Sequence, residues 1–489
     1  MEIFNPDTSN KQSATQTAAN NAIPQHTHTV AINSKIIRCP YCQEEFDINS
    51  VLFRANLDTD TNSDNNFFTP HADDVFLNFW QNKMNWRNSA ELREFSYDYS
   101  IMPKDSTVGT PVSQVKFCIL DDDHIRQIVT NNGYVESAID TRGVATDKRI
   151  CPHCHSLLPL EYGVNDVHFI SIVGIRGSGK TVFLSKLFEQ MDDYLVGTRF
   201  YTIPTDTITR FLQTKALVPG TPVPEGTQPG RVNPPIFMDI TDRAQNVRTL
   251  VFYDIAGEDC NEAANLRQVG TFVGNSAGTI MLISPGQFGS LDNISDDADV
   301  SSTNIYSVYN AIARAFGVAA ARNDRDSNIL RKALRLFKKD LAATDETPLA
   351  IVVSKSDMLI NATIDNAPVF TGNADDIILF KNNDYPSQNS GYMESTSNQV
   401  EALVRRRLFD PLRFNTRVAN VYGNTHYFAV SVLGNSPDER DMKDKDGNPI
   451  RGTDGKVVKE KLVPHNAASL RLEEPIFWIL AKLGILSTI

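Results

Sequence analysis

The sequence has little cysteine, no long apolar run and no excess of positive charge. Six cysteines among 489 residues are too few for a disulfide scaffold. No apolar stretch approaches the ~20 residues that a membrane-spanning helix needs. The formal net charge is −12, so phosphate-rich partners would be repelled outside a local basic patch. The composition therefore disfavours both a membrane span and nucleic acid as a partner.

The N-terminus also lacks the charged start, apolar stretch and small-residue cleavage site of a secretory signal, so we expect a cytoplasmic protein. Residues 1–34 are rich in Asn, Thr, Gln, Ser and Ala and poor in apolar residues, which predicts a disordered tail. The chain as a whole is 41% hydrophobic and 22% charged, as in globular proteins. Its length suggests two to four structural units.

Two regions follow the tail. We expect residues 35–160 to form one unit, which carries a cysteine pair near each end and an inserted segment at 43–150. In residues 161–489, apolar strands alternate with amphipathic helices, which predicts an α/β domain whose mostly parallel sheet has helices on both faces. Asp-Gly turns within 434–466 predict a hairpin. Strands are expected at Val167–Val173, Ile236–Thr241, Leu250–Asp254, Thr279–Ser284, Leu349–Ser354 and His426–Ser431, and helices at Lys180–Tyr194, Asn304–Phe316, Ser327–Leu341, Gln399–Leu408 and Ser469–Leu483.

A glycine-rich loop, residues 174–181, lies between the first predicted strand and the first predicted helix. It reads Gly-Ile-Arg-Gly-Ser-Gly-Lys-Thr and matches G-x-x-x-x-G-K-[ST]. Such a loop turns backbone N–H groups inward around a phosphate, and the helix N-terminus adds a positive dipole end. Lys180 would reach the β- and γ-phosphates, and the hydroxyl of Thr181 would coordinate Mg²⁺. The motif predicts a P-loop nucleoside triphosphatase.

A second motif ends the predicted strand that begins at Leu250. It reads Asp254-Ile255-Ala256-Gly257 and resembles the Walker B strand and the D-x-x-G motif of GTPases. An aspartate at a strand end can hold Mg²⁺ through a water. The backbone N–H of Gly257 could approach the γ-phosphate and so sense GTP versus GDP.

Two further motifs indicate which base is bound. Ser354-Lys355-Ser356-Asp357 resembles [NT]-K-x-D, with serine where the motif has asparagine or threonine. The carboxylate of Asp357 could accept from both N1–H and N2–H₂ of guanine, a donor pair that adenine lacks. The stem of Lys355 would lie across the base. Ser431-Val432-Leu433 resembles the S-A-[KL] segment, with valine in place of alanine.

The order of these motifs resembles the Ras-like, or TRAFAC, class of GTPases over residues 167–485. The resemblance implies GTP or GDP and Mg²⁺ as cofactors, and an antiparallel strand Ile236–Thr241 beside Leu250–Asp254. It assigns Mg²⁺ to Thr181, Asp254 and a switch threonine, for which Thr221 is preferred over Thr227. It assigns the nucleotide to Gly174, Arg176, Gly177, Ser178, Gly179, Lys180, Thr181, Val182, Ser354, Lys355, Asp357, Ser431 and Val432.

Hydrolysis is expected to be slow or to need a partner. Ras-like enzymes orient the attacking water with a glutamine, and Glu258 stands at that position here. A carboxylate could position water, but it also repels a triphosphate. Arg176 either supplies charge to the phosphates or pairs with an acid. The catalytic set is Lys180, Thr181, Thr221, Asp254, Gly257 and Glu258. A P-loop ATPase and a nucleotide-binding scaffold without turnover are the alternatives.

Four of the six cysteines form two Cys-Pro-x-Cys pairs, Cys39 with Cys42 and Cys151 with Cys154. Two such pairs resemble the knuckles of a four-cysteine zinc ribbon, because structural Zn²⁺ takes four tetrahedral ligands. Between the pairs lie 108 residues, far more than in a usual ribbon, which is why segment 43–150 is interpreted as an insertion. A redox Cys-x-x-Cys and two separate sites are the alternatives.

A zinc ribbon with an insert, directly before a TRAFAC-type GTPase domain, resembles the bacterial double-GTPase family. Residues 51–55, 151–159 and 474–478 add to the resemblance. It implies a protein partner, a second GTPase encoded nearby, in bacterial conflict or stress systems, with the ribbon docking that partner. This chain itself contains one glycine-rich loop of this type.

Overall fold

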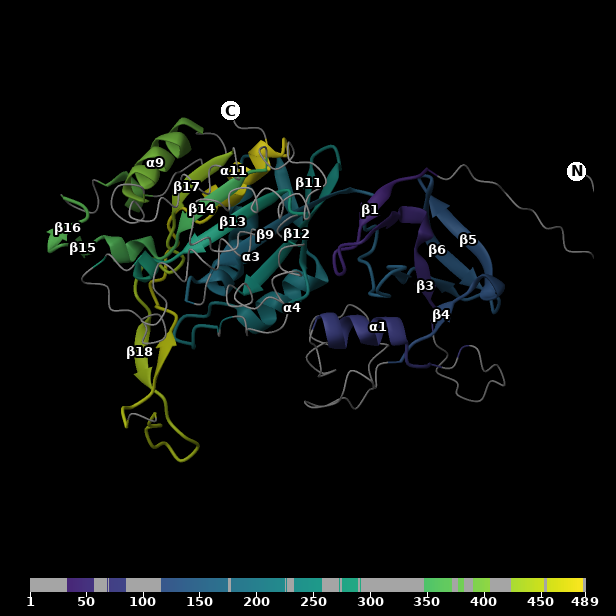
Figure 1. Ribbon diagram of the computed structural model, residues 1–489, viewed down its shortest axis with the longest axis horizontal. Helices are drawn as coiled ribbons and strands as arrows, with labels where there is room; N and C mark the ends of the chain where they lie inside the picture. Colours follow the sequence, from purple (N-terminus) through teal and green to yellow (C-terminus); the bar gives the residue numbers. More distant parts are fainter. Residues whose placement is uncertain are drawn as a thin grey trace, which may run out of the picture.

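The computed structural model describes most of the chain between Asn33 and Leu486 (Figure 1). The predicted helices at 304–316 and 327–341 lie outside the described residues, as does all of the predicted tail except Asn33 and Ser34. The described residues are 33–56, 68, 70–84, 116–174, 177–224, 226, 233–256, 272, 275–288, 291, 347–371, 377–381, 390–404, 424–452 and 455–486.

A seven-stranded, mostly parallel sheet forms the centre of an α/β fold. Its order is β10-β11-β12-β9-β13-β14-β17, and β11 is the one strand of this sheet that runs against the other six. All residues of β13 and β14 are buried, as expected for strands with helices on both faces. The strands are β9 (Asp166–Gly174), β10 (Phe200–Ile203), β11 (Ile236–Asp242), β12 (Val247–Ala256), β13 (Gly278–Ile283), β14 (Leu349–Val353) and β17 (Thr425–Ala429).

The six predicted strands are confirmed to within a few residues, and β11 is confirmed as the antiparallel neighbour of β12. Strand β10 was not predicted. Its four residues form a short edge strand beside β11, where local sequence carries little signal.

Helices pack around the sheet, and two of them begin at other residues than predicted. Helix α3 (Lys180–Leu195) agrees with its prediction, whereas α9 (Ser390–Leu403) begins nine residues before the predicted start. Its buried face includes Thr396 and Ser397, so the apolar periodicity is weak. Helix α11 (Glu474–Lys482) begins five residues late, because Leu470 pairs with Ser431 in a β-bridge and Pro475 occupies the first turn. An additional helix, α4 (Asp206–Lys215), follows β10.

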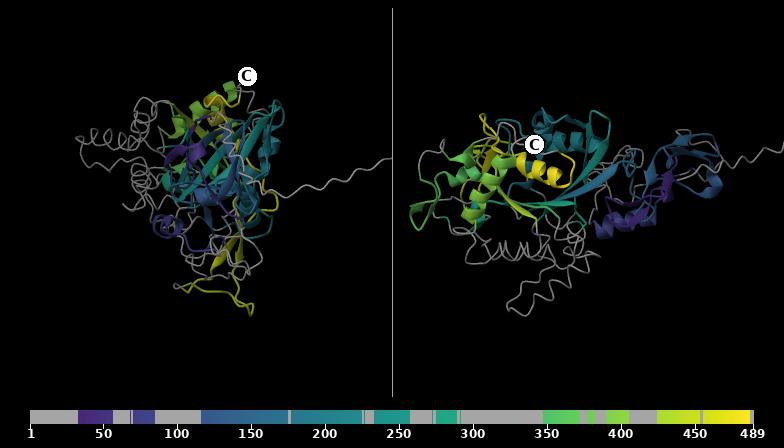
Figure 2. Two further views of the ribbon diagram at one scale, coloured as in Figure 1. Left: turned by 90° about the vertical axis from the view of Figure 1, so that its right-hand side faces the viewer. Right: turned by 90° about the horizontal axis from the view of Figure 1, so that it is seen from above.

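The two faces of the sheet pack against different partners. Leu250 and Phe252 of β12 belong to a core with α3 and α11. Val251 and Tyr253, which alternate with them, belong to a core that continues into the N-terminal part of the chain, including Tyr41. The described residues of the N-terminal unit, which spans 33–164, lie beside the sheet domain in Figure 1 and in the right-hand view of Figure 2.

Three small sheets build the N-terminal unit, with orders β1-β2, β4-β3-β8 and β5-β6-β7. Helix α1 (Asp74–Asn78) continues into a π-helical turn at Phe79–Lys83. The strands are β1 (Ile36–Arg38), β2 (Glu45–Asp47), β3 (Leu52–Arg54), β4 (Ile119–Leu120), β5 (Ile125–Asn131), β6 (Tyr134–Asp140), β7 (Ala145–Thr146) and β8 (Arg149–Ile150).

A C-terminal hairpin projects from the sheet domain, as the predicted turns indicated (Figure 1). It is formed by β18 (Asp438–Asp441) and β19 (Lys459–Leu462). A smaller hairpin is formed by β15 (Thr363–Ile364) and β16 (Ala367–Pro368). Within the described residues, no helix combines the length and the apolar character that crossing a membrane requires.

Candidate functional site

The glycine-rich loop, Asp254 and the segments that carry Ser354, Asp357 and Ser431 all lie at one edge of the sheet. Strands β9, β12, β13, β14 and β17 are parallel, so their carboxyl ends share an edge. The glycine-rich loop follows β9, and β9 lies between β12 and β13. The chain passes from β12 to β13 across β9, so the loop stands where neighbouring connections leave in opposite directions. Open α/β sheets commonly bind ligands at such a point, outside the carboxyl ends of the strands.

Glycine is required at several positions of the loop. Gly177 and Gly179 have φ angles of +81° and +84°, in the left-handed region that disfavours side chains. A Cβ at Gly174 would lie 2.5 Å from Ser178 Oγ and 2.6 Å from the carbonyl oxygen of Leu282. The backbone of the loop therefore passes too close to β13 for any side chain at this position.

The loop leads directly into a helix. Helix α3 begins at Lys180 with Gly179 as its N-cap, so the N–H groups of its first turn face the loop. Lys180 and Thr181 are both buried. The ammonium group of Lys180 donates to the carbonyl oxygen of Gly174, 2.5 Å away, and thereby bridges the two ends of the loop.

Ser354 links the loop to the next strands. It follows β14, and its hydroxyl donates to the carbonyl oxygen of Ser178 over 2.8 Å. Both side chains are buried. The serine that departs from the usual motif thus holds the segment after β14 against the glycine-rich loop.

Asp357 and Ser431 meet although 74 positions separate them. Ser431 Oγ donates to Asp357 Oδ1 over 2.5 Å and accepts from the N–H of Gly434 over 3.0 Å. Asp357 lies in a 3₁₀ turn, Ser356–Leu359, that starts after Lys355 in a left-handed conformation, φ +50°. The turn therefore places the carboxylate beside the segment after β17, where Val432 is also buried.

Asp254 lies two residues before the end of β12, beside Ile172 of β9, and is buried. Strands in a sheet are ~4.8 Å apart, so β12 is about 5 Å from β9 on one side and β14 about 10 Å from it on the other. Asp254 and Asp357 thus stand on opposite sides of the loop. Arg176, Gly257 and Glu258 lie outside the described residues.

Thr221 lies in a different environment. Its hydroxyl donates to the carbonyl oxygen of Val218 over 2.7 Å, and its own carbonyl accepts from the N–H of Val463 over 2.9 Å. Residues 220–223 run along the base of the C-terminal hairpin, and Pro222 bridges to Leu462. Among the described residues, no hydrogen bond joins Thr221 to the glycine-rich loop, so its assignment as the switch threonine stays a prediction.

The four cysteines of the two Cys-Pro-x-Cys pairs converge. All four sulfurs lie within 4.8 Å of one another, and the distances are 3.7 Å between Cys39 and Cys154 and 3.8 Å between Cys42 and Cys151. A tetrahedron of sulfurs about 2.3 Å from a zinc ion has edges of about 3.8 Å. The same distances are too long for a disulfide. The spacing fits a structural zinc ion, and the alternative of two separate sites is wrong.

Backbone and side-chain donors surround these sulfurs. The N–H groups of Tyr41 and Cys42 point to Cys39 Sγ at 3.4 and 3.5 Å, and that of His153 points to Cys151 Sγ at 3.4 Å. Burial raises the pKa of the Cys39 and Cys154 thiols well above the usual value. Buried thiolates there need compensating positive charge, which a metal ion supplies.

Ser156 and Trp80 support the cluster, and neither was singled out from the sequence. Trp80 Nε1 donates to Ser156 Oγ over 3.1 Å, and Ser156 Oγ lies 3.3 Å from Cys154 Sγ. As a thiol, Cys154 donates to Ser156 Oγ, whereas a zinc-bound thiolate would instead accept a hydrogen bond from the serine hydroxyl. Such contacts orient a ligand and tune its basicity. Ser156 follows the second cysteine pair closely, whereas Trp80 is brought close only by folding.

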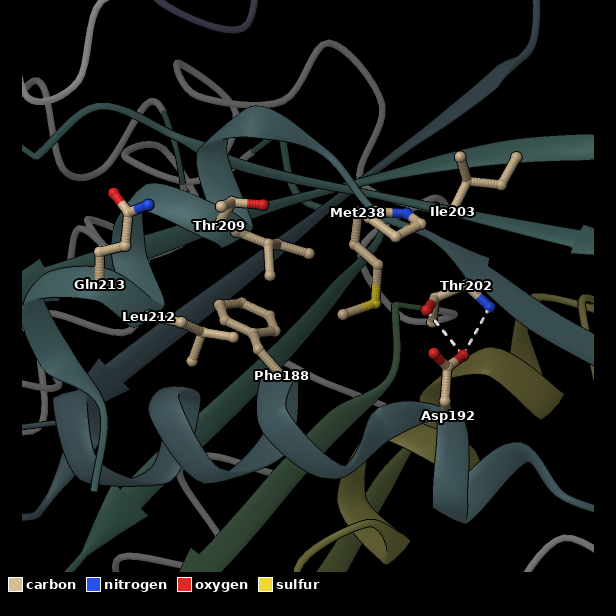
Figure 3. A pocket seen from close by; sticks show the side chains of 10 residues that line it. Phe188, Asp192, Thr202, Ile203, Thr209, Leu212, Gln213 and Met238 are labelled. Carbon is tan, nitrogen blue, oxygen red and sulfur yellow. Dashed lines mark hydrogen bonds between the residues drawn. The ribbon is translucent and has the colours of Figure 1, made fainter. Parts of the chain in front are cut away.

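A separate hollow of about 450 Å³ lies between α3, β10, α4 and β11 (Figure 3). Phe188, Leu212 and Met238 line its apolar part. Asp192 accepts hydrogen bonds from the N–H and the hydroxyl of Thr202, at 2.9 and 2.7 Å, which covers part of the β10 edge. None of the predicted site residues lines this hollow.

Comparisons with known proteins identify no family. No protein-family model and no curated protein matches the chain. One similar solved chain is described as the crystal structure of an SsGBP mutation variant; it is 12% identical and has a TM-score of 0.17. The match covers 54% of this chain and 58% of that chain, so it spans little more than half of the solved protein. A TM-score this low carries no information about fold or function.

Proposed function

We propose that the protein is a guanine-nucleotide-binding GTPase of the P-loop class with a structural zinc site. The main support is the pair of hydroxyl contacts that gather three distant motifs at one sheet edge. Ser354 joins the segment after β14 to the glycine-rich loop, and Ser431 joins the segment after β17 to Asp357. In the proposed binding mode, the phosphates would lie near the first contact and the base near the second.

The proposed binding mode places the phosphates at the glycine-rich loop and at the N-terminus of α3. The left-handed glycines leave backbone N–H groups available to phosphate oxygens, and the helix dipole adds positive potential. Lys180, which now bridges to Gly174, is near enough to exchange that carbonyl for a phosphate oxygen. Thr181 and Asp254 would hold Mg²⁺, which neutralises charge on the phosphates during their transfer.

Base selection would depend on Asp357. Two strand spacings, about 10 Å, separate β9 from β14, which is enough to place a base at Asp357 while the phosphates stay at the loop. The hydroxyl of Ser431 donates to one oxygen of Asp357 and so fixes the carboxylate in place. A fixed carboxylate accepts well from the two donors of guanine and leaves adenine unpaired.

Turnover is proposed to be slow without a partner. Glu258 would position the attacking water less well than glutamine, since its charge repels the γ-phosphate, and Arg176 would offset some of that charge. The switch segments would be ordered by GTP at Gly257 and at the loop containing Thr221, and released after hydrolysis. The partner is proposed to be a protein, a second GTPase in a bacterial conflict or stress system, that docks on the N-terminal unit.

The deciding experiment is binding of fluorescent GTP and ATP analogues to the full chain with Mg²⁺, in competition with unlabelled nucleotides. Competition by GTP and GDP but not by ATP is expected. Competition by ATP alone would replace the proposal with the ATPase alternative. Phosphate release above that of Lys180→Ala would exclude the scaffold without turnover.

Replacement of Asp357 by Asn should move specificity from guanine to xanthine. The amide donates where the carboxylate accepted, so GTP affinity should fall by at least about 100-fold and xanthosine triphosphate should compete instead. Asp365→Asn is the matched control, because Asp365 lies exposed in the turn between β15 and β16. Unchanged GTP affinity in Asp357→Asn would contradict the guanine assignment.

A further inference from the structure

The first cysteine pair contacts the sheet next to Asp254. Residues 39–43, the first knuckle, pack against Tyr253 of β12. Tyr253 Oη donates to the carbonyl oxygen of Pro40 over 2.8 Å and accepts from Gln43 Nε2 over 2.7 Å. Pro40 lies between the two cysteines, so the hydroxyl of Tyr253 binds the backbone of the turn that presents both sulfurs.

Gln43 ties this contact into the knuckle. Its side-chain nitrogen also donates to the carbonyl oxygen of Cys39 over 3.2 Å, and its side-chain oxygen accepts from Asn275 Nδ2 over 3.3 Å. Its backbone is left-handed, φ +66°, and its N–H closes the turn onto the Cys39 carbonyl. The side chain is therefore positioned by the same turn that positions the cysteines.

The hydrogen bonds between Gln43, Tyr253 and the first knuckle are buried. Gln43 is 4% and Tyr253 1% exposed. The ring of Tyr253 packs on Phe272, with centroids 4.6 Å apart, and on Phe169. Breaking these hydrogen bonds would cost free energy, because the buried polar groups cannot form replacement hydrogen bonds with water. A change in the knuckle therefore has to move Tyr253 or leave polar groups unsatisfied.

Tyr253 and Asp254 are consecutive residues on opposite faces of β12. Tyr253 belongs to the core shared with the N-terminal unit, whereas Asp254 has the same parity as Leu250 and Phe252, which face α3. A shift of the tyrosine along or about the strand axis must move the aspartate through the shared backbone. The contact thus connects the cysteine cluster with the proposed Mg²⁺ residue over one peptide unit.

We propose that the first knuckle positions the Asp254 end of β12 through Gln43 and Tyr253, so that zinc binding and Mg²⁺-nucleotide binding strengthen each other. The inference rests on the proposed GTPase function. Tyr253 and Gln43 are positioning residues, and neither is placed in contact with nucleotide. By linkage, the factor by which zinc tightens GTP binding must equal the factor by which GTP tightens zinc binding, about fivefold or more.

The test uses the full chain and three variants. Tyr253→Phe removes the two hydrogen bonds but keeps the ring, and Gln43→Asn shortens the side chain while tolerating the left-handed backbone. Tyr162→Phe is the matched control. Tyr162 is equally buried at the same interface, but its hydroxyl donates to the carbonyl oxygen of Arg38, within the N-terminal unit. Thermal unfolding followed by circular dichroism confirms that each variant is folded.

Two binding measurements form the readout. Zinc affinity is measured by competition with a chromophoric chelator, with and without Mg²⁺-GTP, and GTP affinity is measured with and without zinc. Wild type and Tyr162→Phe should show the same reciprocal factor, about fivefold or more, whereas Tyr253→Phe and Gln43→Asn should show a factor near one. A factor near one in wild type, or an equal factor in Tyr253→Phe, would overturn the inference while leaving the GTPase proposal intact.

Failure of the proposed function has a different signature. Zinc-loaded wild type would then bind no GTP at all, which removes both proposals. Hydrogen exchange tests, without nucleotide, whether the first knuckle positions the carboxyl end of β12. Zinc removal should lower amide protection at the carboxyl end of β12 in wild type and in Tyr162→Phe, and less so in Tyr253→Phe. Unchanged protection in wild type would show that the knuckle does not position this strand.

Discussion

Single hydroxyl groups connect the motifs at the candidate site. Ser354 stands where the motif it resembles has asparagine or threonine, and its hydroxyl donates to the carbonyl oxygen of Ser178. Ser431 likewise serves two partners, Asp357 and the N–H of Gly434. At this scale, one hydroxyl group after β14 and one after β17 are enough to connect segments that lie far apart in the sequence.

Gly174→Ala should damage both the loop and its ligand binding. Its Cβ would lie 2.6 Å from the carbonyl oxygen of Leu282, a backbone atom in β13 that has no room to move. We expect destabilisation of about 1–3 kcal/mol and at least a tenfold loss of nucleotide affinity, measured by urea unfolding and by analogue binding. Gly226→Ala is the control, since its Cβ meets nothing within 4 Å among the described residues. Equal effects of both substitutions would contradict the steric argument.

At the scale of elements, the segment before α11 packs against the segment after β17 and against α9. Leu470 pairs with Ser431, and Arg471 is buried beside Glu474 and Thr396 of α9. Glu473, also buried, precedes the helix, and burial raises the pKa of its carboxyl to about 7, with the charge of Glu474 adding to the shift. Burial therefore disfavours the charged form of the carboxyl groups of Glu473 and Glu474.

The raised pKa of Glu473 predicts a pH dependence of stability. Its carboxyl stays protonated in the folded state while it ionises in the unfolded state above about pH 4.5, so folding stability falls as pH rises from about 4.5 to about 7 and then levels off. Glu473→Gln should remove this component and raise stability at pH 8 by up to about 3 kcal/mol, with little effect at pH 4.5. The positive charge of Arg471 opposes the shift and is already included in the raised pKa of about 7.

Urea midpoints of wild type and variant between pH 4.5 and 8 measure the Glu473 effect. Glu439→Gln, on the exposed strand β18, serves as the control and should leave the pH profile unchanged. A difference between wild type and Glu473→Gln that is constant with pH would argue against a protonated carboxyl in the folded protein.

At the scale of the whole molecule, one continuous core joins the two units. Buried residues of the N-terminal unit, among them Cys39, Tyr41 and Phe46, belong to the same cluster as Phe169 and Tyr253 of the sheet. Tyr41 and Tyr162 both contact Phe237 of β11, with ring centroids 6.4 and 6.0 Å apart. The cysteine cluster therefore supports packing at the interface as well as the fold of its own unit.

One zinc ion per chain is expected from metal analysis of the purified protein. Cys151→Ser should lose most of this zinc and lower the unfolding temperature of the N-terminal unit by at least ~5 °C, because a three-thiolate site leaves buried sulfurs poorly compensated. Cys118→Ser replaces a buried cysteine outside the cluster and should keep full zinc content. Full occupancy in Cys151→Ser, or zinc-free wild type, would contradict the four-cysteine assignment.

The sequence alone determined the features that depend on residues close together along the chain. The order of strands and helices, the turn chemistry of the C-terminal hairpin and the glycines of the loop all follow from local patterns and backbone sterics. These patterns also predicted which segments carry Lys180, Asp254 and Asp357. Helix starts at α9 and α11 were misjudged, because polar residues fill the buried face of α9 and a β-bridge holds the residues before α11.

Only the tertiary structure decided which distant groups touch. Two similar Cys-Pro-x-Cys pairs suggested a meeting, but their sulfurs, 115 and 109 positions apart, converge only because β3 pairs with β8. The contact between Ser354 and Ser178 joins residues that are 176 positions apart, and the contact between Gln43 and Tyr253 joins residues that are 210 positions apart. No local sequence pattern indicates either pair. Such pairings depend on how sheet faces and units pack, a property of the whole chain that no short window of sequence contains.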